Sequence, residues 1–206
     1  MTALDAVRWG SATAAYQIEG SVHTDGRRSS IWDTFAHRPG AIVRGDTGEV
    51  AADIYRNPQA LLDAVSWLGL ETYRLSISWC RIITGPDGET NPAGVQYYRR
   101  LLQSLLARGI RPVVTLYHWD LPQWLQDAGG WTQLATAEAF DHFAATAVRE
   151  FGDLVEDWIT VNEPFCAAFH GHLSGLHAPG IRDEPTAVRA VYVLLHAHGL
   201  ALRTLR

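Results

Sequence analysis

The sequence predicts an α/β fold in which parallel strands alternate with helices. Two observations support this prediction. Four short apolar runs alternate with four segments that carry apolar residues at helical spacing, which is the pattern of consecutive βα units. In addition, 47% of the 206 residues are hydrophobic and 19% are charged. The chain can therefore bury a sizeable core, and its composition is unlike that of a disordered protein.

The first expected βα unit begins with a strand within Val7–Tyr16. A helix is expected over Pro58–Leu68, because proline is favoured in a first turn and a glycine, here Gly69, just after a helix end. Leu70–Trp79 alternates apolar and polar residues, which is typical of a strand. Val95–Arg108 is expected to form the next helix, which ends before a glycine. Its apolar face contains Leu101, Leu102, Leu105 and Leu106.

The last two expected units start with Arg111–Tyr117, whose Val-Val-Thr-Leu run suits a buried parallel strand. A helix over Ala137–Phe151, a strand over Val155–Val161 and a helix over Pro185–Leu205 follow. The apolar stripe of the first of these helices contains Phe140, Phe143, Ala144, Ala147 and Val148. The inward-facing residues expected for the second are Val188, Val191, Leu194 and Leu195.

Aromatic and polar residues recur just after the expected strands. They are Trp79, the group His118-Trp119-Asp120, and the pair Asn162-Glu163. In a (β/α)₈ barrel the functional groups project from the carboxyl ends of the strands, at one face of the barrel. Four units fill the whole chain, whereas a closed barrel needs eight. The sequence therefore predicts the N-terminal half of a TIM barrel, with residues 1–206 as a single partial domain.

Charge and composition exclude several functions. The net charge is −5, so we expect no nucleic acid partner. All 17 basic residues are arginine, which rules out lysine Schiff bases, pyridoxal anchoring and a P-loop. No apolar run approaches the roughly 18 residues of a membrane-spanning helix, and no secretory signal precedes the first strand. We expect a cytoplasmic protein without membrane contact, in which Cys80 and Cys166 are small buried hydrophobic residues.

Nine histidines raise the alternative of a metal-dependent hydrolase on the same barrel. His170 and His172 form a His-x-His pair, but they follow the fourth expected strand rather than the first and have no matching set of ligands. His196 and His198 are two residues apart on a helix and point to different sides. We therefore expect ordinary polar or packed histidines, no metal and no other cofactor.

The segment Thr160–Pro164 suggests carbohydrate chemistry. Pro164 favours an extended backbone at Glu163, which places that carboxyl group at the strand end. Asn162, together with Gln17, His118 and Trp119 after other strands, supplies amide, imidazole and aromatic groups suited to a sugar. Glycoside hydrolysis needs one carboxyl group to protonate the leaving oxygen and a second to attack or activate water. Glu163 is the candidate for the first; the alternative is that it merely caps a strand.

Six motifs resemble glycoside hydrolase family 1, the β-glucosidases, and occur in the order of that family. They are Trp9–Gly20, Ser30–Phe35, Tyr73–Trp79, Thr115–Pro122, Thr160–Pro164 and His177–Gly180. The resemblance extends over essentially all 206 residues. It implies a retaining β-glycosidase on a TIM barrel that hydrolyses terminal β-D-glycosidic bonds of a small β-glucoside or oligosaccharide.

The resemblance also implies roles for individual residues. It assigns Glu163 as the general acid/base and Asn162 as the partner of the sugar 2-hydroxyl. Gln17, His118 and Trp119 correspond to residues that bind the sugar in the first subsite. Arg74 corresponds to the arginine beside the nucleophile, where a cation favours the ionised carboxylate.

The nucleophile of the family lies in a Glu-Asn-Gly motif, and this motif does not occur in the sequence. Glu19, Glu49 and Asp120 are possible substitutes, but we expect none of them to serve. A catalytically inactive half-barrel that binds sugar or assembles with a partner is therefore the alternative to an enzyme. An open half-barrel exposes strand edges, so the expected partner is a second copy of the chain or the C-terminal half of a barrel.

Overall fold

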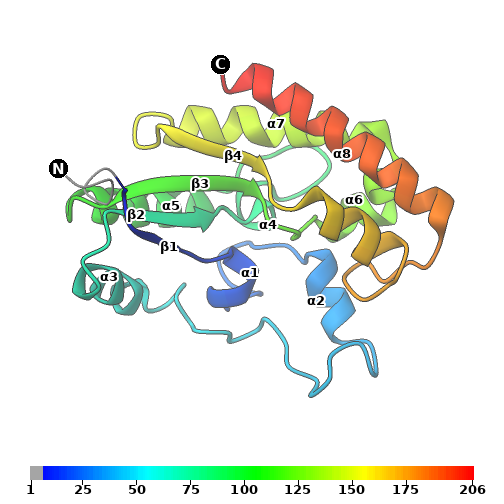
Figure 1. Cartoon of the computed structure of the whole chain (residues 1–206), viewed down its shortest axis with the longest axis horizontal. Coiled ribbons are helices and arrows are strands. Elements are labelled where there is room, and N and C mark those ends of the chain that lie inside the picture. Colours follow the sequence, from blue (N-terminus) through cyan, green and yellow to red (C-terminus); the bar gives the residue numbers. More distant parts are fainter. Residues whose placement is uncertain (1–6) are drawn as a thin grey trace.

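The computed structural model describes residues 7–206, which contain one sheet of four parallel strands in the order β1-β2-β3-β4 (Figure 1). The strands are β1 (Gly10–Ala12), β2 (Thr72–Ser76), β3 (Arg111–Tyr117) and β4 (Asp157–Val161). Each pairs in parallel with its neighbour in sequence order. The predicted alternation of strands and helices is confirmed, although three of the four strands are shorter than the apolar runs that predicted them.

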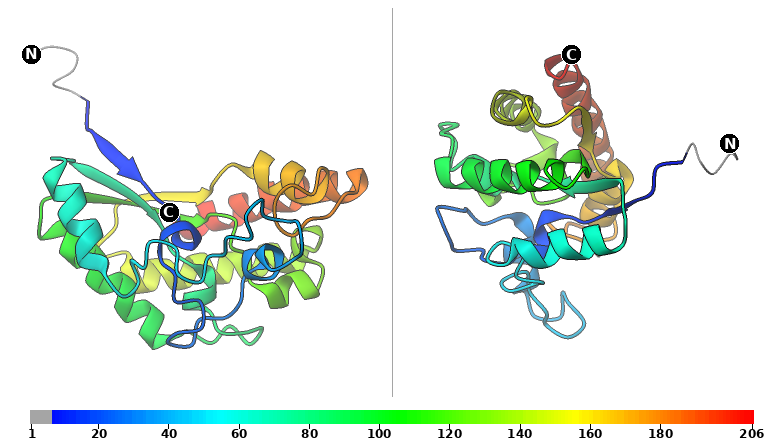
Figure 2. Two further views of the ribbon diagram at one scale, coloured as in Figure 1. Left: turned by 90° about the horizontal axis from the view of Figure 1, so that it is seen from below. Right: turned by 90° about the vertical axis from the view of Figure 1, so that its left-hand side faces the viewer.

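Four long helices follow the four strands, and in the right-hand view of Figure 2 they form an arc around the sheet. They are α3 (Pro58–Trp67), α5 (Pro92–Leu106), α7 (Leu134–Phe151) and α8 (Glu184–Thr204). The shorter helices are α1 (Ala15–Ile18), α2 (Ile31–Ala36), α4 (Trp79–Ile82) and α6 (Gln123–Asp127), with a 3₁₀ turn at Gly130–Thr132 and a π-helical turn at Cys166–His170. Within residues 7–206, no helix is long and apolar enough to cross a membrane.

Capping residues explain where the helices start. Helix α5 begins three residues before the expected position, because the Asn91 side chain accepts a hydrogen bond from the Ala93 amide and Pro92 occupies the first turn. Asp183 caps α8 in the same way by accepting from the Thr186 amide at 2.9 Å. Gly69, after α3, has a φ of +64°, the left-handed conformation that glycine adopts readily.

The strand register separates the two faces of the sheet. Leu75 of β2 pairs with Val114 of β3, and both side chains are buried among the apolar residues of the helix layer. On the opposite face, Arg74 pairs with Val113, and Thr115 pairs with Ile159 of β4. Arg74, Val113 and Ile159 are half-buried, so this face is less covered than the helix side. It corresponds to the inner face of a barrel.

The packing of α8 corrects one prediction. Val188 and Leu195, expected to face inward, are 58% and 55% exposed, whereas Leu194 is buried as expected and Val191 is half-buried. The buried face of α8 contains mainly small residues, namely Ala187, Ala190, Ala197 and Ala201. Small side chains let two helices approach closely, and α8 packs extensively on α7.

Two smaller expectations also change. Leu106, expected on the apolar face of α5, is 41% exposed, because it is the last residue of the helix. Cys80 is fully buried as expected, but Cys166 is half-buried in the π-helical turn after β4.

Candidate active site at the carboxyl ends of the strands

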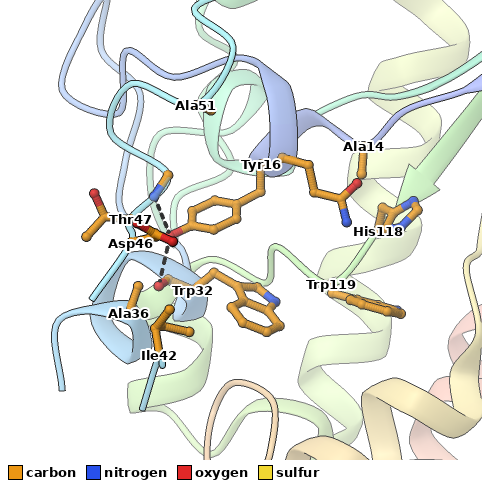
Figure 3. A pocket seen from close by; sticks show the side chains of 12 residues that line it. Ala14, Tyr16, Trp32, Ala36, Ile42, Asp46, Thr47, Ala51, His118 and Trp119 are labelled. Carbon is orange, nitrogen blue, oxygen red and sulfur yellow. Dashed lines mark hydrogen bonds between the residues drawn. The ribbon is translucent and has the colours of Figure 1, made fainter. Parts of the chain in front are cut away.

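A pocket of about 310 Å³ opens where the strands end (Figure 3). Three of the predicted sugar-binding residues line it: Gln17 from α1, and His118 and Trp119 from the segment directly after β3. The other lining residues are Ala14, Tyr16, Trp32, Ala36, Ile42, Asp46, Thr47, Gly48 and Ala51. Residues that are a hundred positions apart in the chain are thus brought to one concave surface.

Hydrogen bonds connect Arg74 of β2 to residues of the next two strands. Its Nη2 donates to Oδ1 of Asn162 at 2.6 Å, and its Nε donates to Oγ1 of Thr115 at 2.9 Å. Nδ2 of Asn162 lies 3.1 Å from Nε2 of His118, and Nε1 of Trp119 donates to the backbone oxygen of Asn162 at 3.0 Å. Four of the six predicted site residues therefore belong to one hydrogen-bonded group, with Asn162 at its centre.

The same contacts determine the ionisation of His118. The pKa of this imidazole is lowered to about 4, mainly by burial and also by the positive charge of Arg74, whereas Glu163 acts in the opposite direction. His118 is therefore neutral at pH 7. Because the amide nitrogen of Asn162 donates, Nε2 of His118 is assigned as the acceptor and Nδ1 carries the proton.

Glu163 follows Asn162 directly and is exposed. The prediction of an extended backbone at this residue is wrong, since its φ is +44°. The Asn162 amide still bonds to Tyr117 of β3, whereas the Glu163 carbonyl already accepts from the Ala167 amide of the following helical turn. The chain therefore changes direction at Glu163. Trp119, with a φ of +76°, is similarly strained; such conformations cost about 1–3 kcal/mol each and cluster at functional sites.

Aromatic side chains that the sequence analysis did not assign to the site form much of its wall. Trp32, which was not among the predicted site residues, lines the pocket, and its backbone oxygen accepts a hydrogen bond from the Tyr16 hydroxyl at 3.1 Å (Figure 3). The His177 ring lies 5.2 Å from that of Trp119 and 5.6 Å from that of Trp32, measured between centroids. Trp32 and His177 lie in two of the family-like motifs, Ser30–Phe35 and His177–Gly180. These motifs were the signal in the sequence that could have pointed to the two side chains.

Trp79 does not belong to the site, although it follows a strand. Its side chain is fully buried and stacks on Phe143 of α7, with ring centroids 5.2 Å apart and an interplanar angle of 7°. This tryptophan is part of the hydrophobic core between the sheet and the helices.

The three carboxylates considered as substitute nucleophiles have other surroundings. Glu19 is buried and accepts from Nε of Arg81 and from the Tyr98 hydroxyl, both at 2.6 Å. Asp120 is buried and does not line the pocket. Glu49 forms an exposed ion pair with His37 at 3.3 Å.

In the part of the chain that the structure describes, no group of three or more His, Cys, Asp or Glu residues is arranged to hold a metal ion. His172 is buried and bonds to the backbone oxygen of Ala167 at 3.1 Å. His198 bonds to the hydroxyl of Thr160 at 2.7 Å, whereas His196 stacks on Tyr192. These contacts are those of packed and polar histidines.

A family model described as glycosyl hydrolase family 1 matches residues 5–206. The chain belongs to glycosyl hydrolase family 1. β-Glucosidase A of Thermotoga maritima is 48% identical over 198 residues, which are 96% of this chain and 44% of that protein. The β-glucosidase of an Agrobacterium species is 42% identical over 198 residues, or 96% of this chain and 43% of the relative.

Solved structures of the family have the same fold. A family 1 β-glucosidase from Thermotoga maritima superposes with a TM-score of 0.95 at 48% identity, covering 97% of this chain and 45% of that structure. The AHE enzyme from Alicyclobacillus herbarius gives a TM-score of 0.94 at 50% identity, over 97% of this chain and 44% of the structure. The chain thus spans less than half the length of these relatives and structures. Its four βα units form half of a TIM barrel, as predicted.

Proposed function

We propose that this chain is the N-terminal half of a retaining β-glucosidase, with Glu163 as its general acid/base. The hydrogen-bonded group around Asn162 carries this proposal. It joins Arg74 of β2 to His118 and Trp119 after β3, and the next residue in the chain is Glu163. A carboxyl group thus follows directly upon a hydrogen-bonded set of polar and aromatic groups, two of which, His118 and Trp119, line the pocket.

The mechanism is a double displacement. Glu163 donates a proton to the glycosidic oxygen as the bond to the anomeric carbon breaks, and a second carboxylate attacks that carbon to form a glycosyl ester. Glu163, now ionised, removes a proton from water, which attacks the same carbon and releases the sugar and the second carboxylate. Retention requires the two carboxyl groups to lie about 5–5.5 Å apart. The C-terminal half of the barrel supplies the second carboxylate in this proposal.

Recognition of the sugar uses the neutral side chains of the pocket. Neutral His118 and Gln17, with Asn162 bonded to His118, form hydrogen bonds with hydroxyl groups, and the indole face of Trp119 packs on the C–H groups of the ring. No metal or organic cofactor takes part. Structures of the Thermotoga maritima β-glucosidase with deoxynojirimycin and with glucoimidazole support a sugar-like ligand for the corresponding fold.

A second candidate is a half-barrel without catalytic activity that assembles with a partner. The outer face of α8 favours assembly, because Val188, Tyr192 and Leu195 are each more than half exposed and form an apolar surface beside the last strand. The partner is the C-terminal half of a barrel or a second copy of this chain. In either case the apolar surface becomes buried and the edge of β4 becomes paired.

Hydrolysis of an aryl β-glucoside by the purified 206-residue chain separates the two candidates. Activity that is lost in Glu163→Gln means that a second carboxylate is present in the chain or in a dimer. If activity instead appears only after the C-terminal part of a family 1 relative is added, the half-enzyme proposal is supported. If that addition gives a stable complex with no activity, the chain is an assembling half-barrel and the catalytic proposal fails.

A further inference from the structure

Thr115 of β3 is a buried threonine whose role the proposed mechanism leaves open. It has no solvent exposure, and its Oγ1 accepts a hydrogen bond from Nε of Arg74 at 2.9 Å. Its backbone oxygen accepts from the Ile77 amide of the neighbouring segment at 3.0 Å. Because threonine is β-branched, few side-chain rotamers are available to it in a strand. The hydroxyl of Thr115 is therefore a fixed acceptor beneath the Arg74 side chain.

The two hydrogen bonds of Arg74 use one edge of its guanidinium group. Nε is bonded to Thr115 and Nη2 to Asn162, and these two nitrogens form the side-on edge of the planar fork. Among residues 7–206, Nη1 of Arg74 has no hydrogen-bond acceptor. The end of the fork is therefore available on the inner face of the sheet, on which Arg74 and Thr115 both lie.

We propose that Thr115 is a positioning residue that holds Arg74 by its side-on edge, so that the guanidinium stays bonded to Asn162, whose side-chain amide in turn reaches His118. This inference rests on the proposed function. It adds a residue of β3, the strand between β2 and β4, to the hydrogen-bonded group around Asn162. With Thr115 and Asn162 as acceptors on two different strands, the guanidinium cannot rotate without breaking a hydrogen bond.

Arg74 in turn acts on His118, which offers a second way to detect its position. Burial, the charge of Arg74 and the opposing charge of Glu163 set the pKa of this histidine. If Arg74 leaves its place, one of the two influences that lower the pKa is reduced. The midpoint of His118 titration then rises toward the ordinary value of a histidine.

The test uses the 206-residue chain, labelled with ¹⁵N, and the variants Thr115→Val and Thr115→Ser. Valine has the shape of threonine without the acceptor, whereas serine keeps the hydroxyl. We expect Thr115→Val to accelerate hydrogen exchange at Nε of Arg74 about tenfold, the equivalent of one lost hydrogen bond, and to raise the midpoint of His118 titration. Thr115→Ser is expected to retain both wild-type values.

Thr160→Val is the matched control, because Thr160 is also a buried strand threonine but bonds to His198 on the helix side of the sheet. This variant is expected to leave Arg74 and His118 unchanged. The proposal is overturned if Thr115→Val keeps the wild-type exchange rate at Nε of Arg74 and the wild-type midpoint of His118. It is also overturned if Thr115→Ser changes both quantities as much as Thr115→Val does. If Thr115→Val does not fold, Thr115→Ala replaces it as the variant without a hydroxyl, and the same comparison with Thr115→Ser is made. Neither measurement requires sugar cleavage, so failure here is distinct from failure of the proposed function.

Discussion

The guanidinium of Arg74 and the side-chain amide of Asn162 are joined by a hydrogen bond of 2.6 Å, although the two residues are 88 positions apart. The bond spans β3, because Arg74 lies on β2 and Asn162 follows β4. A single contact thus joins β2 to the segment after β4, two parts of the sheet that are not neighbours. It also places Asn162 so that its amide nitrogen reaches His118. The polar side of the pocket is therefore held by side-chain contacts as well as by the backbone of the sheet.

His118 is expected to titrate near pH 4 in the folded chain. Burial is the main cause of this low pKa, and Arg74 adds to it. The pKa of His118 is lower in the folded state than in the unfolded state. The neutral imidazole therefore contributes its full stability above the unfolded-state pKa, and this contribution is lost as the pH falls through the folded-state pKa. Histidine ¹H–¹³C NMR spectra recorded between pH 3 and pH 8 measure the midpoint. A midpoint near the ordinary histidine value would contradict the neutral state assigned at this site.

Asp120 is expected to make the chain less stable as the pH rises. Burial raises the pKa of this carboxyl group to about 7. The folded state therefore holds its proton more tightly than the unfolded state, and the stabilisation is lost between the unfolded pKa and about pH 7. Asp120→Asn removes the charge, and the gain in unfolding free energy relative to wild type is expected to grow toward about 4 kcal/mol at pH 8. Urea unfolding at pH 5 and pH 8 provides the comparison.

Asp63→Asn is the control for Asp120, because Asp63 lies on the exposed side of α3. This variant is expected to change stability equally at both pH values. An Asp120→Asn variant whose stability relative to wild type is the same at pH 5 and pH 8 would show that the buried carboxyl group does not titrate in this range.

The buried pair of Glu19 and Arg81 is expected to contribute strongly to folding. Its N–O distance is 2.6 Å, both side chains are almost completely buried, and Tyr98 donates to the second oxygen of Glu19. Arg81→Met leaves a carboxylate without its partner in the core, and we expect a loss of about 3–5 kcal/mol in unfolding free energy. Thermal and urea unfolding measure it.

The exposed pair of Arg99 and Asp153, with a similar N–O distance of 2.7 Å, provides the matched comparison. Arg99→Met is expected to cost much less than Arg81→Met, because solvent screens the charges of an exposed pair. Equal losses in Arg81→Met and Arg99→Met would mean that burial does not determine the strength of these ion pairs in this chain.

Local signals predicted much of the fold correctly. Helix α3 was predicted from Pro58 and Gly69, since proline is tolerated at the start of a helix and glycine adopts the positive φ that ends one. Strand β3 coincides with its predicted range because a continuous apolar run marks a strand buried in a parallel sheet. Both features depend on residues close together in the chain.

Features that depend on distant residues were harder to predict. Val188 and Leu195 fit a helical stripe as well as the alanines of α8 do, and the choice between the two faces depends on packing against α7. Trp32 lines the pocket because α2 lies near Trp119 and His177, which are far away in the sequence. The pattern of polar and aromatic residues after the strands proposed five of the six site residues and the family resemblance added Arg74, whereas the contact between Arg74 and Thr115 required coordinates.

The central claim is that Glu163 protonates the leaving group. It is tested by joining residues 1–206 to the C-terminal part of a family 1 relative and measuring kcat for cellobiose and the rate of the initial dinitrophenolate burst from 2,4-dinitrophenyl β-glucoside. Glu163→Gln is expected to lower kcat for cellobiose by about 10²–10⁴-fold. Formation of the glycosyl ester from the dinitrophenyl glucoside should change far less, because that leaving group needs no proton. Cellobiose hydrolysis at the wild-type rate by Glu163→Gln would contradict the claim.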